Sequence, residues 1–418
     1  MGSFTHDCFI YIGGGILLSI IVQKYGGTSV ATIDKIKSVA KLLIKRKESG
    51  NNMVAVVSAM GKTTDKLISM ANEISKDPSK RELDMLISTG EQVTSSLLAM
   101  TLKEMGHNSI ALTGFQAGIM TGNQHTKAPI LDIDIEKVKK YLSQGKIVIV
   151  AGFQGIDEYG DITTLGRGGS DTTAVALAAK LNCPCEIYTD VKGIYSTDPG
   201  IYPDAKKLDY ISYEEMMEMA SLGAKVIETR AVEMGRKYNV PIYIALNNGE
   251  CLGTYIKEFD ESMETKVITG LTANDDDLMV TINNVPYNMK HIYSIFDKLS
   301  SMDINIDMIS QTAPVNGHVN ISFTAPKDNR YLIDRLIDEL KLTMNEIKVD
   351  IQEDITKISV VGLGMRTQSG VAARIFKIFA DNNIEFKQVT TSEIRISYTI
   401  NTKDKKKAIS GIAKEFNL

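Results

Sequence analysis

The chain has 418 residues and a formal net charge of −4, and 43% of its residues are hydrophobic. A chain of this length does not bury one single core, so we expect two or three domains. The weakly acidic balance excludes a broad nucleic-acid-binding surface. Four cysteines are too few for a disulfide framework, and five scattered histidines show no metal-binding spacing. These features predict a globular protein of the cytoplasm with reduced thiols.

The N-terminal stretch has an unusual composition. Cys8 to Val22 carries no charge, but Gly13–Gly15 interrupts it and no basic segment precedes it. The stretch is too short to span a bilayer, and a signal peptide is not expected. We therefore predict no association with a membrane and assign no function to residues 1–19.

From residue 20 to about residue 248, strand-like segments alternate with helical ones. The first strand, Ile20–Lys24, precedes a turn and a helix whose apolar residues recur at helical spacing from Ile33 to Ile44. This alternation predicts an α/β domain with a mainly parallel sheet sandwiched by helices. The other expected strands are Met53–Val57, Ser109–Leu112, Lys146–Ala151, Glu186–Thr189 and Pro241–Ala245. The other expected helices are Thr64–Ser75, Arg81–Met105, Ile135–Ser143, Ala174–Leu181, Tyr213–Ser221 and Ala224–Tyr238.

An internal repeat follows a polar segment, residues 249–264, that we expect to be a linker. Ile295-Phe296 is matched by Ile375-Phe376, 80 residues later, and the match continues to Ile309 and Val389. Each copy has the pattern of a strand, a helix, two strands and a helix. The repeat therefore predicts two similar small domains.

The stretch Thr164–Thr173 is the most informative in the chain. It has the pattern of a strand end, a glycine turn and the start of an apolar helix. Ser170 or Asp171 is well placed to cap that helix, which leaves backbone N–H groups and a positive dipole end beside Arg167. A fixed guanidinium there is a good receptor for a carboxylate or a phosphate. The alternative is an ordinary capped turn with a surface arginine.

Five loops follow predicted parallel strands, at the edge where open α/β sheets bind ligands. Paired glycines at a helix start let backbone N–H groups approach phosphate oxygens, and Lys24 adds a positive charge beside them. Taken singly, each loop is an ordinary turn, and Glu91, which lies within a predicted helix, is an ordinary solvated residue. The five loops are Lys24–Ser29, Ser58–Thr64, Gly152–Gly155, Gly166–Asp171 and Thr189–Tyr195.

Taken together, these motifs resemble those of the aspartate kinases, a branch of the amino-acid kinase family. The resemblance runs from Val22 to about Leu246 and includes K-Y-G-G-T-S, the Ser58 loop, the helical Gly-Glu, T-L-G-R-G-G-S-D, T-D-V-K-G-I-Y-S-T-D-P and L-G-A-K-V. It implies an amino-acid kinase fold at residues 20–248. The C-terminal repeat resembles the paired ACT regulatory domains of the same enzymes.

The resemblance implies that residues 265–418 form two ferredoxin-like βαββαβ ACT domains. The first would span about 277–352 and the second about 353–418. The second copy lacks one of the four strands that an ACT domain needs, and the strand-like run Val267–Thr272, within residues 265–272, is expected to supply it. The first ACT domain would then be inserted within the second.

The resemblance also implies MgATP-dependent phosphorylation of the side-chain carboxylate of L-aspartate to 4-phospho-L-aspartate, the first step of lysine, threonine and methionine biosynthesis. Arg167 would bind the α-carboxylate of aspartate and Glu91 its α-ammonium, and no protein side chain would hold Mg²⁺. The implied catalytic residues are Lys24, Asp171 and Lys225. The implied aspartate site consists of Ser58, Thr64, Glu91, Arg167, Gly168, Gly169 and Ser170. The implied ATP site consists of Lys24, Gly26, Gly27, Thr28, Thr189, Asp190, Tyr195 and Lys225.

The ACT pair implies regulation by an amino acid, lysine and/or threonine. It also implies a homodimer, or a dimer of dimers, joined through the ACT domains. Effector pockets are expected at that interface, and the residues expected to line them are Asn288, Asn305, Ile306, Asp307 and Gln311.

Two positions depart from the family pattern. Gly200 stands where an arginine that contacts ATP usually follows T-D-P, and Asn284–Asn288 replaces the D-K-P-G turn of lysine- and threonine-regulated relatives. Two other interpretations stay open. One is a kinase of the acetylglutamate or uridylate type, which Glu91 disfavours because an acylated amine offers that carboxylate no cation. The other is a non-catalytic amino-acid sensor, which the joint presence of Lys24, Arg167, Asp171 and Lys225 disfavours.

Overall fold

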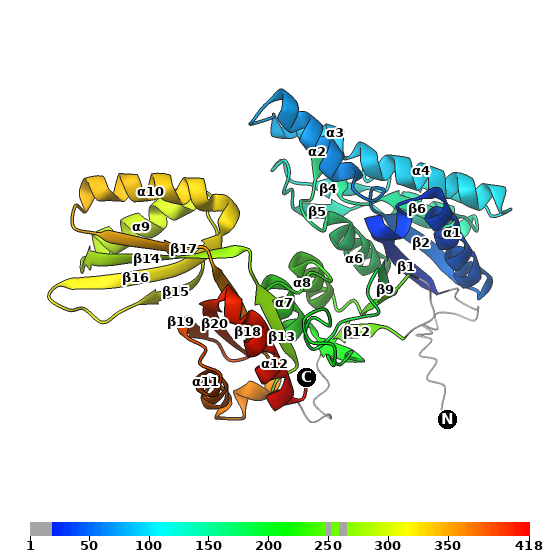
Figure 1. Cartoon of the computed structure of the whole chain (residues 1–418). Coiled ribbons are helices and arrows are strands. Elements are labelled where there is room, and N and C mark those ends of the chain that lie inside the picture. The colour runs from blue at the N-terminus through cyan, green and yellow to red at the C-terminus, as the bar shows by residue number, and fades with distance from the viewer. Residues whose placement is uncertain (1–18, 248–251, 259–265) are drawn as a thin grey trace. The chain divides into compact units, whose positions relative to one another are not determined.

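The computed structural model describes residues 19–247, 252–258 and 266–418 (Figure 1). They divide into two compact units. The first holds the chain up to Ile194, Lys207–Ala220 and the segment that starts at Lys225, and the second holds Tyr195–Lys206, Ser221–Ala224 and the chain after residue 265. Residues 1–18 of the uncharged N-terminal stretch lie outside the described residues. Within the described ranges, no helix is long and apolar enough to cross a membrane.

An eight-stranded sheet forms the centre of the first unit. Its strands are β1 (Ile20–Tyr25), β2 (Asn52–Val57), β3 (Ser109–Leu112), β6 (Ile147–Ala151), β9 (Cys185–Thr189), β10 (Tyr210–Ser212), β11 (Ile242–Leu246) and β12 (Thr254–Lys257). They lie in the order β10-β12-β11-β9-β1-β2-β6-β3, and every pair except β11 with β12 is parallel. Strands β1, β2 and β6 are buried along almost their whole length, as expected for a sheet covered on both faces.

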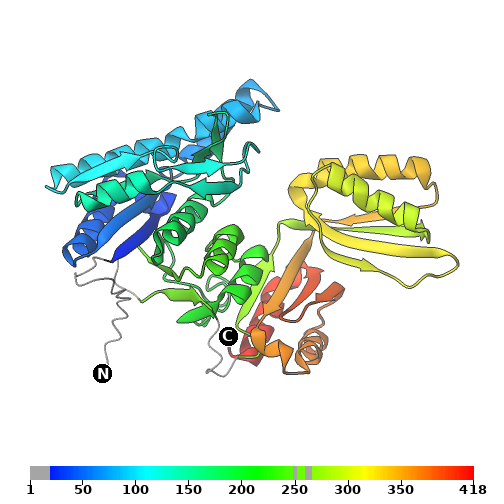
Figure 2. The same cartoon turned by 180° about the vertical axis from the view of Figure 1, so that it is seen from behind.

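Helices cover both faces of this sheet (Figures 1 and 2). The helices of the unit are α1 (Ile33–Glu48), α2 (Thr63–Ile74), α3 (Lys80–Ile87), α4 (Thr89–Glu104), α5 (Glu136–Ser143), α6 (Gly169–Leu181), α7 (Tyr213–Ser221) and α8 (Thr229–Lys237). Of these, α2 and α3 pack on each other, and α3 packs on the strand Ile162–Thr164 of a smaller sheet. On one face α1 and α4 pack against β2, and Leu43 and Leu98 are fully buried there. On the other face α6 packs against β1, β2 and β9 and against α8. Because α6 is enclosed on nearly every side, its N-terminal end is held rigidly.

A second sheet of the first unit was not expected from the sequence. It consists of β4 (Ile119–Thr121), β5 (Ile130–Ile133), β7 (Gln154–Ile156) and β8 (Ile162–Thr164), in the order β5-β4-β7-β8. Strands of three or four residues are too short to show a period of two in the sequence. The Gly166–Asp171 turn follows β8, so the prediction that it follows a strand of the parallel sheet is wrong.

Three further expectations are corrected. The helix expected over Arg81–Met105 is broken at Ser88 into α3 and α4. Helix α8 begins at Thr229, so Lys225 lies in the turn before it rather than in a helix. Residues 254–257 of the expected linker form β12 and pair within the main sheet. The rest of that linker lies largely outside the described residues.

Two four-stranded sheets make up most of the second unit, each covered by two helices (Figure 1). The first sheet has the order β15-β16-β14-β17, and its elements are β14 (Asp277–Pro286), α9 (Met289–Ser301), β15 (Asp307–Gln311), β16 (His318–Pro326), α10 (Arg330–Thr343) and β17 (Lys348–Gln352). The second has the order β13-β18-β20-β19, and its elements are β13 (Gly270–Asn274), β18 (Ile355–Val361), α11 (Val371–Asp381), β19 (Phe386–Thr391), β20 (Arg395–Asn401) and α12 (Lys405–Phe416).

The first of these folds is inserted in the sequence of the second. Strand β13 precedes the insertion, β18 follows it, and the two pair antiparallel with Leu271 opposite Val360. The strand expected at Val267–Thr272 thus lies in the sheet to which it was assigned, a few residues further along the chain. Each sheet has its own core against its own pair of helices.

The place of β13 in the second sheet can be tested by a substitution in its core. Leu271 is 1% exposed within the core of that sheet, so Leu271→Ala should cost about 2–5 kcal/mol of unfolding free energy. Leu342→Ala is the matched control because Leu342 is 82% exposed. Urea unfolding gives the free energy of unfolding of both variants, and hydrogen exchange of the β18 amides shows whether the loss lies in the second sheet. Equal losses for the two variants would contradict the assignment of β13 to this core.

Candidate active site

The N-terminal turn of α6 and the end of β1 are joined by an ion pair. Lys24 Nζ lies 2.6 Å from Asp171 Oδ1, and the two side chains are 11% and 9% exposed. An ammonium this far removed from water needs a partner, and Asp171 supplies it without leaving a net charge. The pair fixes the position of Lys24 beside the glycines of the next loop. The structure therefore brings together two of the three predicted catalytic residues.

The ends of β2 and β6 meet the same helix end. Ser58 Oγ and Ser170 Oγ lie 2.7 Å apart. A Cβ atom at Gly152 would lie 2.8 Å from Cβ of Ser170, so the loop after β6 can approach α6 this closely only with glycine. Ser58 and Ser170, both predicted to bind aspartate, thus form one polar surface.

Glu91 lies in the first turn of α4 and is directed at the loop after β2. It is 4% exposed, and its Oε1 accepts a hydrogen bond of 3.0 Å from the backbone N–H of Ala59. Its other oxygen, Oε2, is buried without a hydrogen-bond partner in the described part of the chain. Burial raises the pKa of Glu91 to about 7. Such a carboxylate is suited to receive a ligand cation, because an ammonium would satisfy the free oxygen and stabilise its charge.

The turn that carries Arg167 depends on two left-handed glycines, Gly166 at φ 84° and Gly168 at φ 61°. Arg167 is exposed between them. The predicted capping is wrong, because the N-cap of α6 is Gly168 and no side chain caps the helix. Ser170 and Asp171 lie in the first helical turn instead, so their side chains are available to the site.

Glu228 is a residue of this site that sequence reasoning missed. A Cβ atom at Gly168 would lie 1.6 Å from Cγ of Glu228, so the glutamate side chain covers the glycine. Burial and the charge of Asp171 raise the pKa of Glu228, while Arg167 and Lys24 oppose the rise. The only signal in the sequence was its place shortly after L-G-A-K-V.

The loop after β1 is built for close backbone approach. A Cβ atom at Gly27 would lie 2.9 Å from the Ala59 carbonyl oxygen, and one at Gly26 would lie 3.5 Å from Lys24 Nζ. Asn247 ties this loop to the end of β9, since its side chain donates to Ser29 Oγ and its N–H to the Thr189 carbonyl. Gly26, Gly27 and Thr189 of the predicted ATP site are therefore neighbours, with Thr28 and Asp190 next to them in the chain.

Thr64, Lys225 and Tyr195 are also predicted site residues. Thr64 is half-buried in the first turn of α2, and Lys225 is exposed in the turn before α8. Tyr195 belongs to the second compact unit. The roles predicted for these three residues stay predictions.

The residues predicted to bind an effector all lie in the second unit. Asn288 is the N-cap of α9, and its side chain accepts from the Lys290 N–H at 2.9 Å. Asp307 lies 3.1 Å from Lys357 Nζ, which also lies 2.6 Å from Asp277. Burial opposes the ionisation of Asp307, but Lys357, the Met308 N–H and Arg395 together hold the pKa of Asp307 below its usual value. Asn305 and Gln311 are exposed and Ile306 is half-buried.

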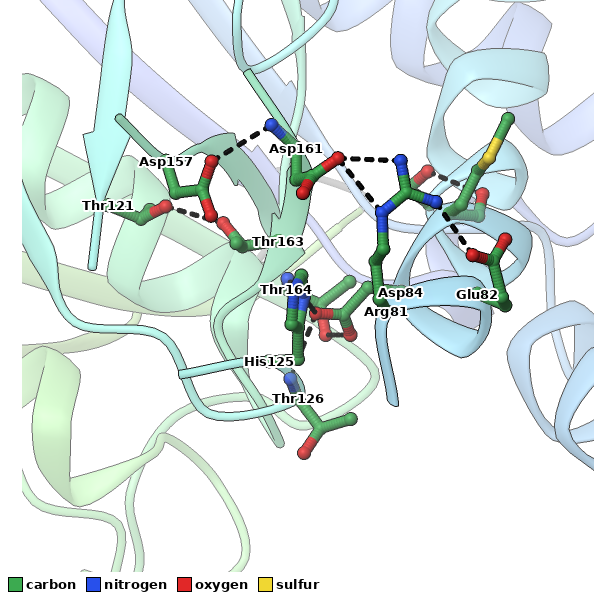
Figure 3. A network of polar contacts seen from close by, with 12 residues as sticks. Arg81, Glu82, Asp84, Thr121, His125, Thr126, Asp157, Asp161, Thr163 and Thr164 are labelled. Atoms are coloured by element: carbon green, nitrogen blue, oxygen red, sulfur yellow. Dashed lines mark hydrogen bonds and ion pairs between the residues drawn. The ribbon is translucent and has the colours of Figure 1, made fainter. Parts of the chain in front are cut away.

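The small sheet carries a polar cluster of its own (Figure 3). Ligand atoms of one histidine and two aspartates, His125, Asp157 and Asp161, lie within 4.8 Å of one another. Asp161 accepts two hydrogen bonds from Arg81, and Asp157 Oδ1 accepts two from backbone N–H groups. These acceptors are engaged by the protein itself, so the cluster is not evidence of a metal site.

The fold and these loops are those of an amino acid kinase. A model of the amino acid kinase family matches residues 19–246, and a model of an ACT domain matches residues 358–416. The aspartokinase of Bacillus sp. (strain MGA3) is 45% identical over 402 residues, covering 96% of this chain and 98% of that protein. The aspartokinase of Pseudomonas aeruginosa is 44% identical over 407 residues, covering 96% and 98%. The chain therefore belongs to the aspartokinase family.

Solved structures are similar over nearly the whole chain. Escherichia coli aspartokinase III in complex with aspartate and ADP has a TM-score of 0.80 at 22% identity, covering 96% of this chain and 100% of that one. At this identity the likeness shows the fold alone. Aspartate kinase from Synechocystis is 36% identical, with a TM-score of 0.54, and covers 96% of this chain and 69% of that one.

The raised pKa of Glu91 predicts a pH-dependent stability. Its protonated form contributes stability that is complete below the unfolded pKa of about 4.5 and is lost as the pH rises through about 7. Glu91→Gln keeps the Ala59 hydrogen bond and removes the buried charge. It should melt at least about 2 °C above the unmodified protein at pH 8, and the difference should vanish towards pH 4.5.

Thermal melting across this pH range measures the effect. Glu158→Gln is the matched control because Glu158 is exposed. A Glu91→Gln difference that does not change with pH would contradict the raised pKa.

Proposed function

We propose that the chain transfers the γ-phosphoryl group of ATP to the side-chain carboxylate of L-aspartate. The observation that carries this proposal is the buried carboxylate of Glu91, whose Oε2 has no hydrogen-bond partner in the described part of the chain. Its Oε1 accepts from the Ala59 N–H, and the adjacent Ser58 contacts Ser170, three residues after Arg167. An α-amino acid carries both a cation and an anion, so Glu91 would receive its ammonium and Arg167 its α-carboxylate.

The reaction needs positive charges that stabilise the phosphoryl group more than it needs a general base. The attacking side-chain carboxylate has a pKa of about 4 and is ionised at pH 7. The difficulty is to bring this anion to a polyanion and to stabilise the transferring phosphoryl group. Lys24, held by Asp171, and the backbone N–H groups of the Gly26-Gly27 loop are suited to that task. We infer that Lys225 adds a second cation.

We propose that Mg²⁺ binds together with ATP. Asp171, a carboxylate that could ligate it, is already paired with Lys24, which favours a cation held by the phosphates. When bound, Mg²⁺ would neutralise charge on the phosphates. We also propose a cytoplasmic location, where ATP is available, and the free thiols of Cys183 and Cys185 agree with a reducing compartment.

The two alternative functions, a kinase of the acetylglutamate or uridylate type and a non-catalytic amino-acid sensor, are distinguished by the substrates that the chain turns over. An N-acylated or non-amino substrate would leave the Glu91 carboxylate buried without a cation, which costs free energy. A non-catalytic sensor would bind an amino acid without turnover. A coupled assay of ADP release, with aspartate and then with N-acetylglutamate or UMP, separates these functions. Turnover with aspartate alone supports the proposal.

Arg167 provides the sharpest test of the aspartate site. Arg167→Lys keeps the charge but loses the paired hydrogen bonds that a guanidinium makes with a carboxylate. Bonds of this kind are worth roughly 1.5–3 kcal/mol, so kcat/KM for aspartate should fall at least about tenfold. Steady-state kinetics measure this, and Arg236→Lys, at an exposed position on α8, is the control. Unchanged aspartate kinetics in Arg167→Lys would falsify its assignment.

We propose that an amino acid, lysine and/or threonine, inhibits the enzyme through the second unit, and that the chain assembles there as a homodimer or dimer of dimers. Exposed apolar side chains around the Asn288 turn and β15 support an interface: Tyr287, Met289, Tyr293 and Ile309 are each more than half exposed. Escherichia coli aspartokinase III has been solved with lysine and aspartate, in a chain of the same fold. Asp307 is already paired with Lys357, so we assign the effector's ammonium to backbone carbonyls rather than to that carboxylate.

Gln311 tests the regulatory proposal. It is exposed at the end of β15 and lies outside the kinase unit, so Gln311→Ala should relieve inhibition and leave the uninhibited kcat within about twofold. A tenfold shift in inhibition corresponds to only about 1.4 kcal/mol of differential binding. Lysine and threonine are titrated alone and together against both proteins. Identical inhibition curves would place the effector elsewhere, and flat curves for both would mean that neither amino acid regulates the enzyme.

A further inference from the structure

Asp84, on α3, is fully buried and surrounded by hydrogen-bond donors (Figure 3). Its Oδ2 accepts from the backbone N–H groups of Thr126 at 2.9 Å and Thr164 at 3.1 Å, and it lies 3.0 Å from His125 Nδ1. Its Oδ1 accepts from the Thr164 hydroxyl at 2.5 Å. In the tautomer that carries its hydrogen on Nδ1, His125 completes a set of four donors. A buried carboxylate with this many donors holds its neighbours in a fixed geometry.

These donors come from two segments that lie against each other. His125 and Thr126 belong to the loop between β4 and β5, and Thr164 is the last residue of β8, directly before the Arg167 turn. The loop and the turn also touch without Asp84. Ala128 N–H donates to the Thr164 carbonyl at 2.9 Å, and a Cβ atom at Gly166 would lie 3.1 Å from the Thr126 carbonyl oxygen.

Arg230, on α8, holds the same two segments from another direction. It is half-buried, and it donates to the Leu165 carbonyl from NH1 and to the Ala128 carbonyl from NH2, each at 2.9 Å. One charged side chain thus binds the residue before Gly166 and the loop that Asp84 binds. These hydrogen bonds restrict the turn. Arg167 lies between two glycines, and glycine allows more backbone conformations than any other residue.

We propose that Asp84 is a positioning residue for the amino-acid substrate. It does not contact the substrate; it acts through Thr164, which sets where the turn begins and so where the Arg167 guanidinium lies. Arg230 supports the other side of the same turn. This inference rests on the proposed function of Arg167, and it predicts that loss of Asp84 weakens recognition of aspartate more than recognition of ATP.

The test compares KM for aspartate with KM for ATP. Asp84→Asn removes the negative charge that faces these donors and leaves its amide NH₂ only the Thr164 hydroxyl or His125 as a possible acceptor, so KM for aspartate should rise at least about tenfold while KM for ATP stays within about threefold. Thr164→Val removes one donor and keeps the shape, so it should raise KM for aspartate about fivefold. Thr164→Ser keeps the hydroxyl and should stay within twofold of the unmodified enzyme. The Val and Ser pair decides the question if Asp84→Asn does not fold.

Asp161→Asn is the matched control. Asp161 belongs to the same polar cluster and accepts from Arg81, but the turn makes no described contact with its side chain, so both KM values should stay within twofold. Equal changes in both KM values for Asp84→Asn and Thr164→Val, or no change, would overturn the positioning role. An unmodified enzyme that releases no ADP with aspartate would instead overturn the proposed function, and this inference with it.

Discussion

A kinase that phosphorylates a carboxylate must bring two anions together, and the Lys24–Asp171 ion pair joins the two elements that carry the proposed site. Lys24 is the next-to-last residue of a buried strand, and Asp171 lies in the first turn of an enclosed helix, so the pair connects the sheet to the helix. A lysine without a partner at such a place would lose much of its hydration without compensation. The role proposed for Lys24 beside the phosphate groups depends on this pair.

The rest of the site divides between the two sheets of the first unit. The loops that suit phosphate groups, at Gly26 and Thr189, follow strands of the parallel sheet. The turn that carries Arg167 follows β8 of the small sheet and is held there by Asp84. Ser58 and Ser170 join the two regions through a single hydrogen bond. The loops proposed to bind the nucleotide therefore follow the main sheet, whereas the turn proposed to bind the α-carboxylate of aspartate follows the small sheet.

Much of this arrangement could be predicted from the sequence, because its signals are local. The βα alternation identified the main sheet, and the glycine motifs identified Lys24, Arg167, Ser170 and Asp171. The small sheet could not be predicted, because its strands have three or four residues and resemble loops. The break at Ser88 was missed because α3 and α4 keep a continuous helical pattern. The burial of Glu91 and the donors around Asp84 depend on contacts between residues far apart in the chain, for which a single sequence carries no signal.

The segment Tyr195–Lys206 connects the two units through the chain itself. It carries the S-T-D-P motif and Gly200, and it belongs to the second compact unit although the chain on both sides of it belongs to the first. Ser196 accepts from the Leu271 N–H at 2.7 Å, and Ile201 and Tyr202 pack on the core that holds β13.

Both ends of this segment are anchored in the kinase unit. Ile194 donates to Thr254 Oγ1 at 2.9 Å and accepts from the Leu208 N–H at 2.8 Å. The proposed regulation therefore has a covalent route, because Tyr195–Lys206 contacts β13 and continues into the kinase unit at both of its ends. The inserted fold is connected to the rest of the chain through β13 at one end and β18 at the other. A change in the inserted fold is therefore transmitted to both strands. If an effector binds the inactive conformation about 1.4 kcal/mol more tightly than the active one, the ratio of the two conformations changes tenfold.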